Sequence, residues 1–161
     1  MRAAVALLAA AALCAHAGSI GGELAYPGEE IPALVVVAAD KVSGRQFSVR
    51  TAANQRTYRI EIPAGVRGSF LVFALPVEEV RQPWGEPPLR GAYTFASLCA
   101  VATPGKNVAG GCKDHRLLAV EVSGDKDVTR IAIDDWYLGA EEIARLPALV
   151  PGGGSRSPKS P

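Results

Sequence analysis

Hydrophobic and polar side chains alternate with a period of two along much of this 161-residue chain, which is the spacing of a β-strand with one buried face. The stretch TYRIEI is the cleanest example of the pattern. It predicts that Tyr58, Ile60 and Ile62 face a hydrophobic core. Arg59 and Glu61, which lie between them, are expected to face solvent.

Two other segments are apolar almost without interruption. The stretches ALVVVAAD (residues 33–40) and GSFLVFAL (residues 68–75) have the continuous pattern of strands that are buried on both faces. Between them, QFSVRT alternates and places Phe47, Val49 and Thr51 on one face. The sequences KVSG, AANQ and PAG, which separate these strands, contain the residues that tight turns require.

The same reasoning extends to the rest of the domain and gives no long helix. The predicted strands cover residues 20–26, 33–40, 46–51, 57–62, 68–75, 92–101, 116–123 and 127–134. Seven or eight short strands at regular spacing predict an all-β fold, namely an antiparallel β-sandwich with Greek-key connections. A closed β-barrel is the alternative arrangement of such strands.

The N-terminal end has the pattern of an export signal. Arg2 precedes an uninterrupted apolar run over residues 3–14, and Ala-His-Ala at residues 15–17 fits a cleavage site. We expect a Sec-type signal peptide over residues 1–17, cleaved before Gly18, and a periplasmic or secreted mature protein of bacterial type. The alternative is a lipoprotein acylated at Cys14, but Leu13 stands where a small residue is normally required.

The remainder of the chain divides into three parts. Residues 18–138 are expected to form the β-sandwich domain, whose length suffices for one hydrophobic core. Residues 139–150 form a linker, with a short helical turn at residues 140–146 that Pro147 stops. Residues 151–161 are rich in Gly, Ser and Pro and are expected to form a disordered tail.

Charge argues against a nucleic-acid partner. The full chain has 17 Lys and Arg against 16 Asp and Glu, and the signal peptide contains only one of these, Arg2. The mature chain is therefore close to neutral and has no basic stripe of the kind that nucleic-acid binding needs. The mature chain also has no apolar run long enough for a transmembrane helix. We therefore expect no nucleic-acid partner and no transmembrane segment in the mature chain.

Cysteine spacing predicts one disulfide. After cleavage the chain keeps two cysteines, Cys99 and Cys112, on either side of a loop rich in Gly and Pro, and one histidine, His115. A structural zinc site usually has four Cys or His ligands, and only three are present here. In an oxidising compartment the two thiols are expected to form a bridge. Free thiols and a three-ligand metal site are the alternatives.

The first half of the domain resembles a known family. The stretches GGELAYPGEEIPALVVVAAD, GRQFSVRT and RTYRIEIPAGVRGSFLVFA are similar to the carboxypeptidase regulatory-like or transthyretin-like (prealbumin) β-sandwich, over residues 21–74. The matching positions are Gly22, Leu24, Pro32, Val35, Val37, Thr51, Tyr58, Ile60, Pro63, Ala64 and Gly65. The resemblance implies an Ig-like or prealbumin-like Greek key. It also implies an accessory role, because such domains are generally non-catalytic modules.

One member of that fold, the transthyretin-like hydrolase of urate catabolism, is an enzyme. Its active site uses several histidines, whereas the mature chain has one, so no catalytic residue carries over. The second half of the chain, with GGCKDH and IAIDDWY, resembles small exported bacterial proteins of unassigned function. A reaction cannot be assigned from that resemblance, since a fold alone does not determine function.

A polar cluster is the candidate for chemistry. It consists of Asp114, His115, Asp134 and Asp135. A small hydrolase or a metal-dependent enzyme could use these side chains if the fold brought them together. Neighbours on an extended chain point to opposite faces, however, so Asp114 is poorly placed to orient His115. We therefore predict no catalytic residue, no metal and no cofactor.

A binding surface is the other candidate. Residues 76–91 contain several prolines and no strand pattern, and irregular segments of this length are often functional. The candidate contact residues are Arg81, Trp84, Arg90 and Tyr93, with Trp84 either a platform for a ligand or a lid over the core. The sequence thus favours an exported, non-catalytic binding module, whose partner is an envelope protein or a carbohydrate.

Overall fold

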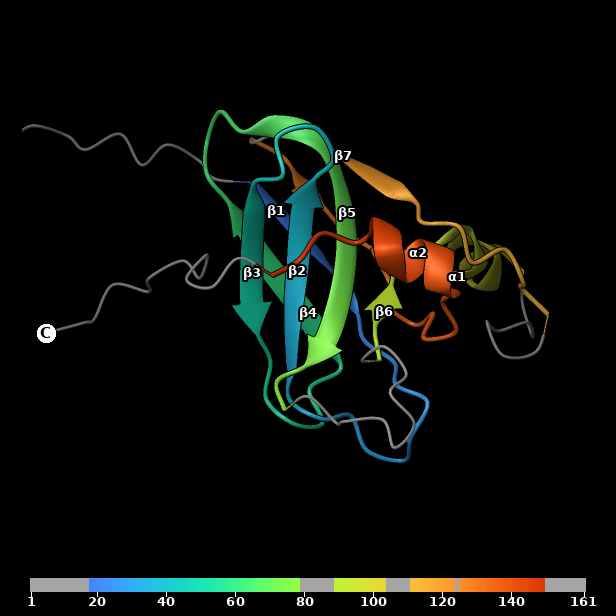
Figure 1. Cartoon of the computed structure of the whole chain (residues 1–161). Coiled ribbons are helices and arrows are strands. Elements are labelled where there is room, and N and C mark those ends of the chain that lie inside the picture. The colour runs from blue at the N-terminus through green and yellow to red at the C-terminus, as the bar shows by residue number, and fades with distance from the viewer. Residues whose placement is uncertain (1–17, 79–88, 104–110, 124, 150–161) are drawn as a thin grey trace, which may run out of the picture.

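Two β-sheets pack face to face (Figure 1). The structure is a computed structural model, and it describes residues 18–78, 89–103, 111–123 and 125–149. The smaller sheet has three strands in the order β4-β1-β8. The larger sheet has five strands, in the order β3-β2-β5-β6, with β7 also paired to β5. The residues of the expected signal peptide, those of the expected C-terminal tail and most of the Pro-rich segment lie outside the described residues.

The three-stranded sheet is centred on β1 (Gly18–Glu23). Strand β4 (Thr57–Ile62) pairs with it antiparallel, so that Ile20 lies opposite Ile60, and the short β8 (Asp127–Val128) pairs with it parallel. Buried and exposed residues alternate along β4 without a break. The predicted orientation of TYRIEI is therefore confirmed, with its three apolar residues in the core.

The five-stranded sheet is built around two long strands. β2 (Leu34–Asp40) pairs antiparallel with β3 (Gln46–Arg50) on one edge and with β5 (Arg67–Pro76) on the other. Because β5 has ten residues, its second edge carries both β6 (Gly91–Ala92) and β7 (Ala119–Ser123), one after the other. This long strand therefore connects the early and late parts of the chain.

The main hydrophobic core lies between the two sheets. Its largest fully buried side chains include Ile20, Ile60 and Phe70, and Trp136 packs against the same cluster. The indole of Trp136 donates a hydrogen bond to the Ala25 carbonyl at 2.6 Å, which satisfies its one polar group. Trp136 thus closes one part of the core.

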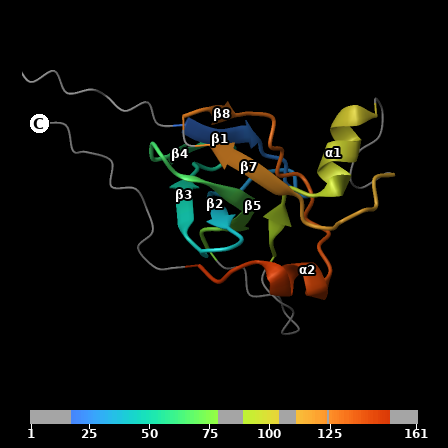
Figure 2. The same cartoon turned by 90° about the horizontal axis from the view of Figure 1, so that it is seen from above.

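A second apolar cluster covers the outer face of the larger sheet. Its buried members are Val37, Ala39, Phe73, Leu75 and Ala92, and Leu138 and Leu146 pack on them from either side of a short helix, α2 (Ala140–Arg145). Figure 2 shows α2 on the side of the large sheet opposite β1 and β8. This third layer explains why β2 and β5 are apolar on both faces. The expected helical turn is present as α2.

The strand predicted over residues 92–101 is wrong. The chain leaves the sheet after β6 and forms a helix, α1 (Phe95–Ala102). Thr94 is its N-cap: the Thr94 side chain accepts a hydrogen bond from the Ser97 amide, and the Ser97 hydroxyl accepts one from the Thr94 amide. This reciprocal capping box starts a helix in a segment that has little polar periodicity of its own.

The last two predicted strands are shorter than expected. β7 begins only at Ala119, and β8 ends at Val128 because Arg130 has a positive φ of 64°, which a continuous strand does not contain. The chain then returns to the sandwich through single bridges, Leu24 with Ile133 and Ala92 with Asp135. The fold is nevertheless the expected one, a mostly antiparallel all-β sandwich. None of the helices within the described residues is long and apolar enough to cross a membrane.

Candidate functional site

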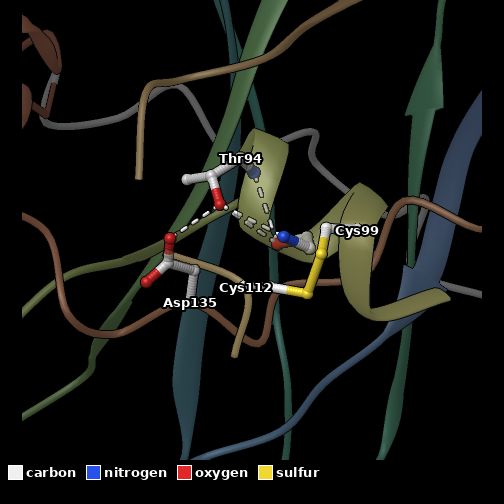
Figure 3. The surroundings of a disulfide bond; sticks show 5 residues. Thr94, Cys99, Cys112 and Asp135 are labelled. Atoms are coloured by element: carbon white, nitrogen blue, oxygen red, sulfur yellow. Dashed lines mark hydrogen bonds between the residues drawn. A yellow bond between two sulfur atoms is a disulfide. The ribbon is translucent and has the colours of Figure 1, made fainter. Parts of the chain in front are cut away.

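The predicted disulfide is present. Cys99 of α1 and Cys112 are bridged, with 5.8 Å between their Cα atoms, as Figure 3 shows. Cys112 is buried and packs with Ala96 in a small cluster of its own. The bridge therefore fixes α1 to the segment that leads into β7. It also favours an oxidising compartment.

A buried carboxylate, Asp135, organises the residues beside the bridge. The Thr94 hydroxyl donates to it at 2.6 Å, and the Tyr137 amide donates at 3.1 Å. Nδ1 of His115 lies 2.9–3.0 Å from both carboxylate oxygens. Because an ionised carboxylate only accepts hydrogen bonds, Nδ1 carries the proton. Asp135 therefore links the N-cap of α1 to His115, and it is completely buried.

Asp114 takes no part in that network. Its two oxygens accept hydrogen bonds from the Arg116 guanidinium at 2.8 and 2.6 Å, and this pairing lowers the pKa of Asp114 to about 2. The expectation that Asp114 would not orient His115 is confirmed. Asp135, twenty residues further along the chain, does so instead.

Asp134 points away from Asp135, because the two are successive residues of an extended segment, and it joins the network only through Ser97. Burial raises the pKa of Asp134, while a hydrogen bond from Ser97 opposes the effect. Its Oδ1 is buried without a hydrogen-bond partner among the described residues. The four-residue polar cluster of the sequence thus contains one direct pair, His115 with Asp135, while Asp134 contacts Ser97 and Asp114 pairs with Arg116. Within the described ranges no three His, Cys, Asp or Glu side chains form a metal-binding group.

An open groove of about 500 Å³ lies on the outer side of the larger sheet. Its residues come from β2, β5, α1, the segment before β7 and the region around α2: Ala39, Asp40, Lys41, Gly44, Leu71, Phe95, Arg116, Leu117, Arg145 and Pro147. We call its apolar members, Ala39, Leu71, Phe95, Leu117 and Pro147, the floor and its charged members, Asp40, Lys41, Arg116 and Arg145, the rim. Volumes of this size are typical of ligand sites.

The rim of the groove is cationic. Among the described residues it contains three cations, Lys41, Arg116 and Arg145, and one carboxylate, Asp40. That carboxylate is already bound by the turn after β2: Asp40 accepts hydrogen bonds from the amides of Val42 and Ser43, and these bonds lower its pKa. Lys41 and Arg145 form no ion pair with any residue in the described part of the chain. The groove therefore has two cations available for an anionic ligand.

Arg116 is held in place on this rim. Its guanidinium lies 5.0 Å from the centre of the Phe95 ring, at cation–π distance, and also pairs with Asp114. The sequence analysis overlooked Lys41, Phe95, Arg116 and Arg145, because the groove joins segments that are far apart along the chain. The one local signal for α1 was Thr94, a preferred N-cap residue type, with Ser97 three residues later, where Glu or Gln is the usual capping-box residue.

The binding surface proposed from the sequence is only partly described. Arg81 and Trp84 lie outside the described residues, so their role as contacts stays a prediction. Arg90 is half-buried and makes contacts of its own. Tyr93, expected as an interface residue, is instead a core residue with 9% of its surface exposed, because it follows β6 directly and packs between the sheets. Desolvation raises its pKa.

Comparison with protein-family models, curated proteins and solved structures finds no match for this chain. The fold defines an all-β sandwich domain with one disulfide, two sheets and a helix on the outer face of the larger sheet. Function has to be argued from the side chains.

Proposed function

We propose that this chain is an exported, non-catalytic binding module and that the groove over the larger sheet is its binding site. The observation that carries the proposal is the combination of an apolar floor with a rim that has three cations and, among the described residues, one carboxylate. Apolar lining with a few placed charges is typical of ligand sites. The ligand we expect is anionic, and an envelope protein with exposed carboxylates fits best.

Two further observations support export and an accessory role. A disulfide is favoured in the periplasm and outside the cell, where the apolar N-terminal segment would direct the chain. The resemblance of residues 21–74 to carboxypeptidase regulatory-like and transthyretin-like domains fits an accessory module. We include membership of that family in the proposal.

A small hydrolase centred on His115 is the second candidate function. The observation in its favour is the oriented imidazole, whose Nδ1 faces the buried carboxylate of Asp135. Such a pair activates a nucleophile only when a hydroxyl or thiol lies at the other ring nitrogen. Here the Thr94 hydroxyl donates to Asp135, and both cysteines are in the disulfide. These contacts fit a structural role for His115 better than a catalytic one.

Affinity capture from a periplasmic extract and from culture medium tests the binding function. The oxidised wild type is compared with Lys41→Glu/Arg145→Glu, which reverses the two available cations. Arg50→Glu/Lys126→Glu is the matched control, because it makes the same change of charge at exposed positions outside the groove. Glycan arrays are probed with all three proteins to test the carbohydrate alternative.

We expect the wild type and the control to retain the same protein, and the groove variant to lose it. Equal retention by all three proteins, or none by the wild type, would contradict the proposed site. If acidic glycans bind and the groove variant loses that binding, the proposed site is correct and the ligand is a carbohydrate rather than a protein. Hydrolysis of model ester or amide substrates that disappears in His115→Ala would favour the enzyme instead.

A further inference from the structure

The outward side of α1 is apolar. The helix FASLCAVA has no charged residue, and Phe95, Leu98 and Val101 are exposed over 38%, 45% and 63% of their surfaces. Their spacing of three residues puts them along one side of the helix. A helix on the surface of a soluble domain usually has polar residues on that side. An exposed apolar stripe of this kind is typical of an interaction surface.

Three sets of contacts fix the helix that carries this stripe. The capping box fixes its first turn, the Thr94 hydroxyl is bound to buried Asp135, and Cys99 is joined to Cys112 (Figure 3). On its inner side, Ala96 and Ser97 are buried. The outward side chains are therefore presented by an ordered support, which lowers the entropy that binding would cost.

The stripe is continuous with the groove. Phe95 belongs to both: it is the first residue of α1, and it lines the groove next to Arg116 and Leu117. Figure 2 places α1 beyond the edge of the larger sheet, so that the helix extends away from the sandwich. An occupant of the groove that continued past Phe95 would meet Leu98 and then Val101.

We propose that the groove and the outward side of α1 form one docking surface for an acidic amphipathic segment of a partner protein. The proposal rests on the binding function given above and names its partner class. The apolar side of the segment would cover Phe95, Leu98 and Val101, and its Asp or Glu residues would face Lys41 and Arg145. We call these five residues the docking surface.

The chemistry of this surface selects that occupant over others. Leu98 and Val101 have no side-chain hydrogen-bonding group, which a sugar chain would need along its hydroxyls. The eight residues of α1 span about 12 Å at 1.5 Å per residue, so the stripe and groove together exceed one small molecule. The side chains of residues 150–161 include two cations and no acid, so the charge of this tail does not match the rim.

A peptide-display selection tests the proposal. Oxidised wild-type protein is used to select from a phage library of random 16-residue peptides, and the enriched peptides are synthesised for affinity measurement. Leu98→Ser/Val101→Ser removes the stripe, and Lys41→Glu/Arg145→Glu reverses the rim. The controls are Val42→Ser, an apolar residue that is 93% exposed in a turn, and Arg50→Glu/Lys126→Glu. Circular dichroism and the melting temperature establish that each variant is folded.

We expect enriched peptides with Asp or Glu beside apolar residues at helical spacing. Their affinity should fall at least tenfold in each docking-surface variant and change less than twofold in the controls. If only the rim variant weakens binding, the groove function stands and the role of α1 is wrong. Peptides without acidic residues, no enrichment, or equal loss in the controls would overturn the inference. Gel filtration that shows a dimer lost in Leu98→Ser/Val101→Ser would also overturn it, because a second copy would then be the occupant.

Discussion

At the scale of single residues, three aspartates near α1 have different roles because their surroundings differ. Asp135 is completely buried and accepts hydrogen bonds from Thr94, His115 and Tyr137. Asp114 is paired with Arg116 in solvent. Asp134 is half-buried with one unpaired oxygen. Burial and pairing, rather than residue type, decide what each carboxylate contributes to stability.

Asp135→Ala should lower the free energy of unfolding by about 3 kcal/mol, because it leaves several buried donors without an acceptor. Urea denaturation of the oxidised protein measures this change. Asp114→Ala is the control, with a far smaller effect, since the side chain of Asp114 pairs with Arg116 in solvent. Equal effects of the two substitutions would show that the Asp135 network does not hold α1.

Asp134→Asn should stabilise the protein at neutral pH. Burial raises the pKa of Asp134 above its unfolded value, so the ionised group destabilises the folded state at any pH above the folded pKa. This destabilisation decreases as the pH falls from the folded pKa towards the unfolded pKa, because the carboxyl of the folded protein takes up its proton. The gain from Asn should therefore be larger at pH 7 than at pH 4, as urea denaturation at both pH values would measure. A gain that grows on acidification would refute this account.

At the scale of elements, the strands follow from local pattern, and α1 does not. In TYRIEI the alternation determines which side chains are buried, and β4 forms as predicted. Residues 95–102 contain aliphatic and aromatic side chains that suit either a strand or a helix. The helix forms because Thr94 and Ser97 cap its first turn and the Asp135 carboxylate binds the Thr94 hydroxyl. Asp135 is distant in sequence, so alternation alone could not reveal this.

The register of β4 gives a matched pair of substitutions. Ile60→Ala should cost about 2–5 kcal/mol, because Ile60 is 1% exposed and its truncation leaves a cavity between the sheets. Glu61→Ala should cost about 0.5 kcal/mol or less, since its ion pair with Arg59 is exposed. Chemical denaturation measures both. Similar costs would mean that β4 is turned the other way.

The disulfide is expected to stabilise α1 and its surroundings. Cys99→Ser/Cys112→Ser should lower the free energy of unfolding by about 3 kcal/mol, as for a loop whose ends are 13 residues apart. Mass spectrometry of exported native protein should show no free thiol before reduction and a gain of two hydrogens after it. Stoichiometric labelling of both cysteines in unreduced protein would contradict the bridge.

At the scale of the whole molecule, the sequence predicted the sandwich, the disulfide and α2, because each depends on a pattern within a few residues or on a count of cysteines. The groove could not be predicted in this way. Lys41, Phe95 and Arg145 belong to segments that are far apart along the chain and meet only in the folded molecule. The particular pairing of His115 with Asp135 could not be predicted for the same reason.

The three layers divide the molecule into a structural and a candidate binding side. The three-stranded sheet closes the main core with β1, β4 and β8. The other side has the second apolar cluster, α2 and the groove, and the groove continues to α1 beyond the edge of the sheet. The central claim is that binding takes place on this second side.

Mapping of amide chemical shifts tests that claim most directly. Oxidised, ¹⁵N-labelled protein is titrated with the tightest-binding acidic peptide from the selection. The account predicts that the largest shifts occur at Leu71, Phe95, Leu98 and Leu117, and that they disappear when Lys41→Glu/Arg145→Glu is titrated with the same peptide. Shifts centred on β1, β4 and β8, or on residues 76–93, would place the binding site elsewhere and contradict the account.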